Sequence, residues 1–103
     1  MSRKIIAILR EIKPNEVLEV AHTIVNAGIT QIEVPMNSPS VFDSIKLLHN
    51  EFDGHIQIGA GTVTNIEQVE ILSDIGVDFI VSPNFDSKVV EATKKADMLS
   101  YPG

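Results

Sequence analysis

The sequence predicts an α/β fold with a parallel sheet, covering about the first five strands and four helices of a (β/α)8, or TIM, barrel. Short apolar segments alternate four times with amphipathic helical segments, and a fifth apolar segment follows. This alternation is typical of right-handed βαβ units in a parallel sheet. An internal repeat supports the barrel, because Gly28 and Pro35 recur as Gly76 and Pro83, each 48 residues later. Two strand–helix units of about 24 residues give this offset.

The first strand–helix unit combines a buried strand with a helix that has clear start and stop signals. Residues 5–9 form a continuous apolar run, which is typical of a strand covered on both faces. Pro14 is expected to begin the helix, because proline at the first helical position loses no hydrogen bond. Apolar residues recur at helical spacing from Val17, and Gly28 is the expected stop.

The second strand, residues 32–36, contains a carboxylate within an apolar run. Side chains alternate across a strand, so Ile32 and Val34 are expected to face helices while Glu33 points to the inner side of the sheet. A carboxylate near the C-terminal end of a barrel strand lies where barrel enzymes place catalytic groups. The alternative is a glutamate at a sheet edge, hydrated or paired with a cation.

The second and third helices have predicted N-terminal caps. Ser38 is expected to cap the second helix, with Pro39 as its first helical residue and Gly54 as its end. Thr64 and Glu67 have the spacing of a capping box, which predicts the start of the third helix.

Three further strands are predicted. Residues 56–63 form a strand that is expected to end in a glycine-bearing turn, and residues 79–83 form the fourth strand. Asp86 or Ser87 is expected to cap the fourth helix, and residues 98–101 form the fifth strand.

The predicted first and fifth strands would be open, apolar edges of a parallel sheet, and such edges must be covered. We therefore expect residues 1–103 to be a single domain that forms the N-terminal part of a longer barrel. The alternative is a complete flavodoxin-like sheet, which has five strands but usually ends on a helix.

Composition narrows the class of protein. The net charge of −6 argues against nucleic acid or an anionic membrane as a partner, because both require basic surfaces. The absence of cysteine excludes disulfides, thiolate nucleophiles and cysteine-ligated metals, and it agrees with a cytoplasmic location. His22, His49 and His55 have no metal-site spacing, so no metal is predicted. No apolar run is long enough to span a membrane.

Polar candidates follow four successive strands. They are Arg10, then Glu33 with Asn37, then residues 59–62, then residues 82–84 with Pro83. The C-terminal ends of parallel strands share one rim, where ligands bind.

Each candidate has a chemical interpretation and a structural one. Arg10 can bind a carboxylate or phosphate, or it can form a salt bridge with Glu11 or Glu33 at the rim. Gly61 and Thr62 offer close backbone approach to a ligand and a hydroxyl near a helix N-terminus. The alternative is that a tight turn alone requires the glycines. No lysine lies where the barrel interior would desolvate it, so none is predicted to form a Schiff base.

Four segments together resemble the class I 2-keto-3-deoxy-6-phospho-sugar-acid aldolases, a (β/α)8 family. They are residues 6–10, 32–39, 58–63 and 102–103. The arginine segment and the E-V-P-M-N-S-P segment are more similar to the 6-phosphogalactonate branch, because the gluconate branch more often has arginine at the position of Asn37. The resemblance extends over essentially all 103 residues, about half of the usual family length.

The resemblance implies reversible cleavage to pyruvate and a phosphorylated three-carbon aldehyde, with no cofactor. Glu33 matches the glutamate that moves protons, and its pKa is expected to be raised. Arg10 and Thr62 match groups that hold the substrate carboxylate or nearby oxygens. Asn37, Gly61 and Pro83 complete the expected substrate-binding set. A homotrimer in the cytoplasm is also implied.

One departure from the family concerns the Schiff-base lysine, which lies on strand six and is therefore absent from these 103 residues. We expect this chain alone to be inactive. The alternatives are a 2-keto-3-deoxy-6-phosphogluconate aldolase, another phosphate-handling barrel enzyme such as an isomerase or decarboxylase, and a non-catalytic half-barrel that pairs its edges with another chain.

Overall fold

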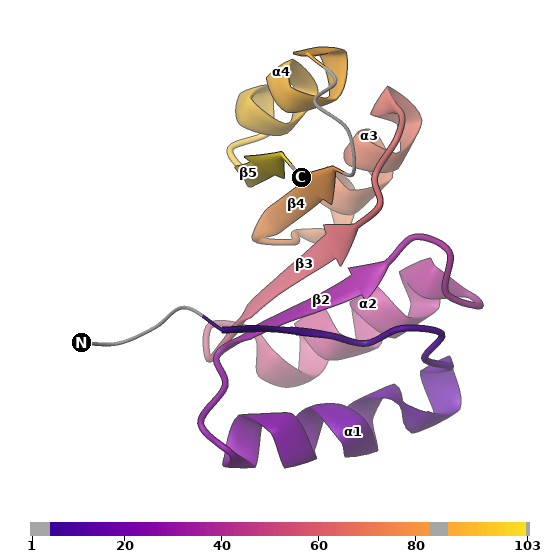
Figure 1. Ribbon diagram of the computed structural model, residues 1–103, viewed down its shortest axis with the longest axis vertical. Coiled ribbons are helices and arrows are strands. Elements are labelled where there is room, and N and C mark those ends of the chain that lie inside the picture. The colour runs from indigo at the N-terminus through magenta and orange to yellow at the C-terminus, as the bar shows by residue number, and fades with distance from the viewer. Residues whose placement is uncertain (1–4, 83–86, 103) are drawn as a thin grey trace.

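The computed structural model describes residues 5–82 and 87–102, and its five strands form one parallel sheet in chain order (Figure 1). Figure 1 shows the helices along one side of the row of strands. The predicted order of elements is confirmed. The elements are β1 (Ile6–Ile8), α1 (Pro14–Asn26), β2 (Gln31–Pro35), α2 (Val41–Phe52), β3 (Gln57–Gly61), α3 (Ile66–Ile75), β4 (Phe79–Ser82), α4 (Ser87–Lys95) and β5 (Leu99–Pro102).

The hydrophobic core lies between the helices and one face of the sheet. Ile32 and Val34 on β2 belong to this core, as do Ile58 on β3 and Ile80 on β4. The helices contribute buried side chains such as Leu48, which is fully buried on α2. Burial of each such side chain stabilises the fold by about 1.5–3 kcal/mol. The core therefore orients the strands so that their alternate residues point to the opposite, inner face.

One row of residues in register crosses the inner face of the sheet. Neighbouring members are paired on adjacent strands, in the order Ile8, Glu33, Gly59, Phe79 and Leu99. We call this set the inner row. Its two outer members are half-exposed, Ile8 at 48% and Leu99 at 49%, whereas Glu33 and Phe79 are buried. The row lies on the face of the sheet that would line the interior of a closed barrel.

The start of α2 differs from the prediction. The helix begins at Val41 with Ser40 as its N-cap residue, so Ser38 and Pro39 precede it. The backbone N–H of Ser38 donates to the Pro35 carbonyl at 3.0 Å, which closes a turn directly after β2. This turn uses the residues that the sequence pattern assigned to the helix start, and it delays the helix by two residues.

The start of α3 is also shifted by one residue. Asn65, rather than Thr64, is the N-cap, and its side chain accepts a hydrogen bond from the Gln68 N–H at 2.9 Å. The Gln68 side chain in turn accepts from the Thr64 N–H at 2.9 Å. Reciprocal bonds of this kind satisfy N–H groups that a helix leaves free, and glutamine replaces Glu67 in that role.

Helices α1 and α2 are joined at the surface by a histidine. His22 Nε2 lies 2.6 Å from Glu51 Oε2, and the His22 ring centroid lies 4.8 Å from that of Phe52. Both members of the pair are substantially exposed, so the contact contributes at most about 1 kcal/mol. None of the helices in the described part of the chain is long and apolar enough to cross a membrane.

Candidate active site at the C-terminal ends of the strands

The candidate site is centred on Glu33, whose position is determined by its strand. Ile32 and Val34 are fully buried toward the helices, so the alternation of β2 turns Glu33 to the inner face. The Glu33 carbonyl accepts a hydrogen bond from the Leu9 N–H at 2.9 Å, and Ile8 and Gly59 flank the residue in register. A carboxylate is therefore held inside the sheet rather than at its edge, as predicted.

Three other predicted residues share a cavity with Glu33. Arg10 follows β1, Asn37 follows β2 and Thr62 follows β3, and all three line a cavity of about 520 Å³ together with Glu33. The other lining residues are Ile8, Glu11 and Pro35. Four candidates that are separated by up to 52 residues in sequence thus meet at the rim where parallel strands end.

The polar side chains of this cavity are available to a ligand. Within the described residues, Arg10, Asn37 and Thr62 form no side-chain hydrogen bond to protein, and Arg10 forms no ion pair. The predicted alternative for Arg10, a rim salt bridge with Glu11 or Glu33, is absent from this part of the chain. A guanidinium, an amide and a hydroxyl can together bind a carboxylate and neighbouring hydroxyl groups.

Burial changes the acidity of Glu33. The side chain is 7% exposed, and loss of hydration raises the pKa of its carboxyl above the ordinary value of 4.5, while the Arg10 charge opposes this shift. The desolvation effect is the larger of the two. The predicted direction of the pKa shift is confirmed. A carboxylate whose pKa is raised is a stronger base than an ordinary carboxylate, so it is better suited to accept a proton and to return it.

Of the two remaining predicted site residues, Gly61 lies next to Glu33 and Pro83 is not described by the structure. Gly61 ends β3 and contacts the Glu33 carboxylate instead of lining the cavity. It also pairs in register with Pro35, and its carbonyl accepts a hydrogen bond from the Met36 N–H at 2.8 Å. Gly61 therefore lies against the Glu33 carboxylate at the end of β3. Pro83 lies outside the described residues.

Glu11 is a site residue that the sequence analysis considered only as a salt-bridge partner. It lines the same cavity, and its backbone has φ of 54°, in the left-handed region that favours glycine. Thr62, which also lines the cavity, has φ of 58°. Ser40 and Asp97 also have positive φ but do not line the cavity, so the backbone of Glu11 supports its role only together with its position. The sequence signal for Glu11 is its position directly after Arg10, at the end of a strand.

Replacing Glu11 with glycine is expected to raise the free energy of unfolding by about 0.5–1 kcal/mol, because glycine adopts positive φ without strain. Urea denaturation at pH 7 measures this change. Asp53→Gly is the matched control, since Asp53 is exposed but has φ of −51°, and it is expected to be neutral or destabilising. Equal effects of the two substitutions would refute strain at Glu11.

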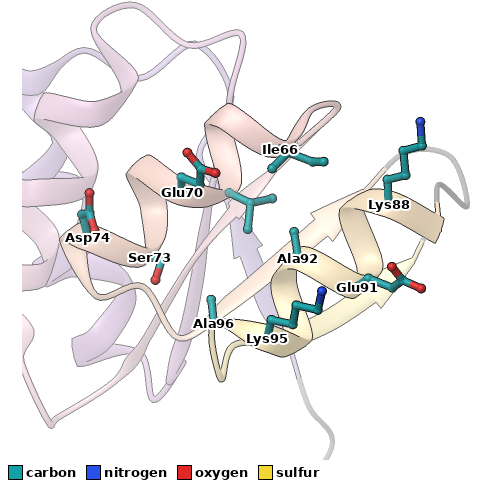
Figure 2. Close-up of a pocket in the computed structure, with 10 residues that line it drawn as sticks. Ile66, Glu70, Ser73, Asp74, Lys88, Glu91, Ala92, Lys95 and Ala96 are labelled. Atoms are coloured by element: carbon teal, nitrogen blue, oxygen red, sulfur yellow. The ribbon is translucent and has the colours of Figure 1, made fainter.

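The groove between α3 and α4 is a separate feature of the molecule (Figure 2). It has a volume of about 470 Å³, and every residue that lines it comes from these two helices or directly follows α4. It contains none of the predicted site residues. Among the described residues, no cluster of three or more His, Cys, Asp or Glu could hold a metal ion.

Comparison with proteins of known sequence finds one family along the whole chain. Residues 1–103 match the family model described as KDPG and KHG aldolase. The chain is 41% identical to the probable 2-dehydro-3-deoxy-6-phosphogalactonate aldolase of Rhizobium meliloti, over 100% of this chain and 49% of that protein. It is 38% identical to the 2-dehydro-3-deoxy-6-phosphogalactonate aldolase of Escherichia coli K12, over 96% and 48% respectively.

A solved structure described as native KDPGal matches with a TM-score of 0.94 at 37% identity, covering 100% of this chain and 51% of that one. A Legionella pneumophila KDPG aldolase, with pyruvate captured as a covalent carbinolamine, matches with a TM-score of 0.88 at 27% identity, over 97% and 48%. The chain spans about half the length of these relatives. The predicted architecture is confirmed, and the chain belongs to the KDPG and KHG aldolase family.

Proposed function

We propose that this chain carries the proton-transfer group of a class I aldolase. A protein that contains this chain and spans the full length of its relatives, which we call the natural-length protein, is proposed to cleave 2-dehydro-3-deoxy-6-phosphogalactonate reversibly to pyruvate and glyceraldehyde 3-phosphate. The observation that carries the proposal is the convergence of Arg10, Asn37 and Thr62 on a buried carboxylate with a raised pKa, Glu33. Relatives named as phosphogalactonate aldolases, at 41% and 38% identity, support the substrate class.

The proposed chemistry proceeds through an amine adduct. A lysine amine adds to the keto carbon, and loss of water gives an iminium ion. The C4 hydroxyl then loses its proton as the C3–C4 bond breaks, and the bonding electrons form an enamine while the aldehyde leaves. Protonation of the enamine at C3 and hydrolysis release pyruvate and regenerate the amine. The carbinolamine captured in the Legionella relative supports this route.

Glu33 is the residue of this chain that we propose to transfer these protons. It accepts a proton in one step and returns it in another, which requires a pKa near the working pH. Its burial between Ile8 and Gly59 in the inner row raises its pKa in that direction. Arg10 binds the substrate carboxylate, while Asn37 and Thr62 donate to or accept from the substrate oxygens.

We propose that the Schiff-base lysine lies on a sixth strand that these 103 residues do not include, and no lysine is among the residues that line the cavity. The test is the intact mass of the natural-length protein before and after treatment with pyruvate and borohydride. The expected result is a species of about twice 11.3 kDa that gains one reduced pyruvate, whereas the 103-residue chain gains none. A folded natural-length protein without an adduct would refute the class I mechanism. An adduct on the 103-residue chain would refute an external lysine.

The gluconate series is the second candidate substrate. Relatives named 2-dehydro-3-deoxy-phosphogluconate aldolases are 29% and 30% identical, which is less than the phosphogalactonate relatives. Asn37 at the rim also favours the galactonate branch. A comparison of kcat/KM for the two C4 epimers decides between them, with a higher value expected for the galactonate epimer.

We also propose that the natural-length protein is a homotrimer that works in the cytoplasm. A cage designed by fusing symmetric oligomeric domains is 39% identical to this chain over 95% of its length, which supports an oligomer. Sedimentation equilibrium measures the number of subunits, and cell fractionation measures the location. A non-catalytic half-barrel is the remaining alternative, and a folded 103-residue species that is inert and obligately oligomeric would favour it.

A further inference from the structure

We propose that Gly61 is a positioning residue, because its lack of a side chain creates the slot in which the Glu33 carboxylate lies. The inference deepens the proposed function, since it concerns how the proton-transfer group is held. A methyl group built on Gly61 would overlap Glu33 Oε2, and it would lie 2.5 Å from Cδ and 3.1 Å from Oε1. The carboxylate therefore occupies the space that any other residue at position 61 would fill.

The register of the sheet explains why Glu33 uses this slot and not the one beside it. Glu33 is paired with Gly59 on the neighbouring strand β3. Because Gly59 has no side chain, the space over it is the nearest place on β3 where the Glu33 carboxylate could lie. That space is filled, because a methyl group on Gly59 would overlap three atoms of the Phe79 ring. Phe79 is fully buried and paired with Gly59 from the other side. The carboxylate is thus directed two residues along β3, to the end of the strand and the cavity.

Backbone geometry does not require glycine at position 61. The described glycines with positive φ are Gly28, Gly54 and Gly76, and Gly61 lies in β3 with ordinary strand pairing to Pro35. A tight turn, the alternative that the sequence left open, therefore does not explain this glycine. The space that the Glu33 side chain needs explains why glycine is found at position 61.

The two glycines of β3 provide a matched pair of substitutions. In Gly61→Ala the methyl group meets the end of a flexible side chain, so the fold is expected to be retained while the carboxylate moves toward solvent. In Gly59→Ala the methyl group meets a buried aromatic ring that has no room to move. The first substitution is expected to change the chemistry of Glu33, and the second is expected to change stability.

The test is a pH titration of the ¹³C-labelled Glu33 carboxyl by NMR, together with thermal unfolding, in both variants. The expected result is that Gly61→Ala lowers the pKa of Glu33 toward 4.5 with a small change in Tm. Gly59→Ala is expected to keep the raised pKa and to lose more Tm. An unchanged or higher Glu33 pKa in Gly61→Ala, or an equal shift in both variants, would overturn the inference.

A double variant covers the case in which Gly61→Ala does not fold. If the methyl group conflicts only with Glu33, then Glu33→Ala combined with Gly61→Ala restores folding, and failure to restore it overturns the inference. In the natural-length enzyme, Gly61→Ala is expected to lower kcat about 100-fold with little change in KM, as displacement of a catalytic group by about 1 Å does. The NMR titration does not depend on activity, so it separates failure of this inference from failure of the proposed function.

Discussion

Replacing Glu33 with glutamine is expected to lower the aldol cleavage rate of the natural-length protein by about 10²–10⁴-fold, because the amide cannot accept and return a proton. The same substitution is expected to make the chain more stable at neutral pH. Burial raises the pKa of Glu33, so the ionised form is less stable in the folded chain than in the unfolded one. Glutamine has nearly the same shape and does not ionise.

The pH dependence of this gain follows from proton binding. Because its pKa is raised, the folded state holds the Glu33 proton more tightly than the unfolded state does. The free energy of unfolding therefore falls as pH rises through the native pKa of Glu33. Each unit by which that pKa is raised corresponds to about 1.4 kcal/mol. Above the native pKa, Glu33→Gln is therefore expected to have a higher free energy of unfolding than the wild type. Below pH 4.5, where Glu33 is protonated in both states, this difference is expected to disappear.

Urea denaturation of the wild type and of Glu33→Gln, at a series of pH values from acid to neutral, measures this difference. Glu19→Gln is the control, because Glu19 is an exposed residue on α1 outside the cavity. A gain from Glu33→Gln that is the same at acid and at neutral pH would show that ionisation of Glu33 is not its cause. Full catalytic activity of Glu33→Gln would refute the assigned role.

Replacing Ile32 with alanine is expected to lower the free energy of unfolding by about 2–5 kcal/mol, because the side chain is fully buried and its removal leaves a cavity. Ile32 lies on β2, which is paired on both sides, and it packs into the core beneath the helices. For a chain of this size, each kcal/mol lowers Tm by about 4–8 °C. Ile32 and Glu33 are sequence neighbours on opposite faces of the sheet, so adjacent substitutions are expected to have opposite effects.

Thermal and urea unfolding measure the effect of Ile32→Ala. Ile71→Ala is the control, because Ile71 is 41% exposed on α3, and its loss is expected to be below about 1 kcal/mol. Similar losses from the two substitutions would contradict the assignment of Ile32 to the core.

The strands and helices were predictable because their signals are local. The apolar run around Ile32 and Val34, the proline at the start of α1 and Gly76 at the end of α3 each specify an element or its boundary. Helix starts were less predictable where two capping residues compete. Ser38 is the N-cap that the sequence predicts, but its N–H donates to the Pro35 carbonyl in a turn, and Ser40 takes the N-cap position without a side-chain capping hydrogen bond.

The candidate site was predictable as a set but not in its internal arrangement. Because parallel strands end at one rim, Arg10, Glu33, Asn37 and Thr62 could be grouped from their places in the sequence. The proposed role of Gly61 in positioning the Glu33 carboxylate could not be predicted. It depends on the register of β2 with β3 and on the Phe79 ring that fills the space over Gly59. Such contacts between distant residues leave no periodic pattern in the sequence.

The strand order also has a consequence for folding kinetics and hydrogen exchange. Because strands pair in chain order, Ile6 meets Gln31 and Phe79 meets Leu99, and each pairing closes a loop of only about 20–25 residues. The sheet can therefore grow one unit at a time from a central nucleus, as repeat proteins do. Amides of β2, β3 and β4 should exchange more slowly than those of β1 and β5, since in the described chain β1 and β5 each have one neighbour. Glu33 would then lie in the part of the sheet that opens least often.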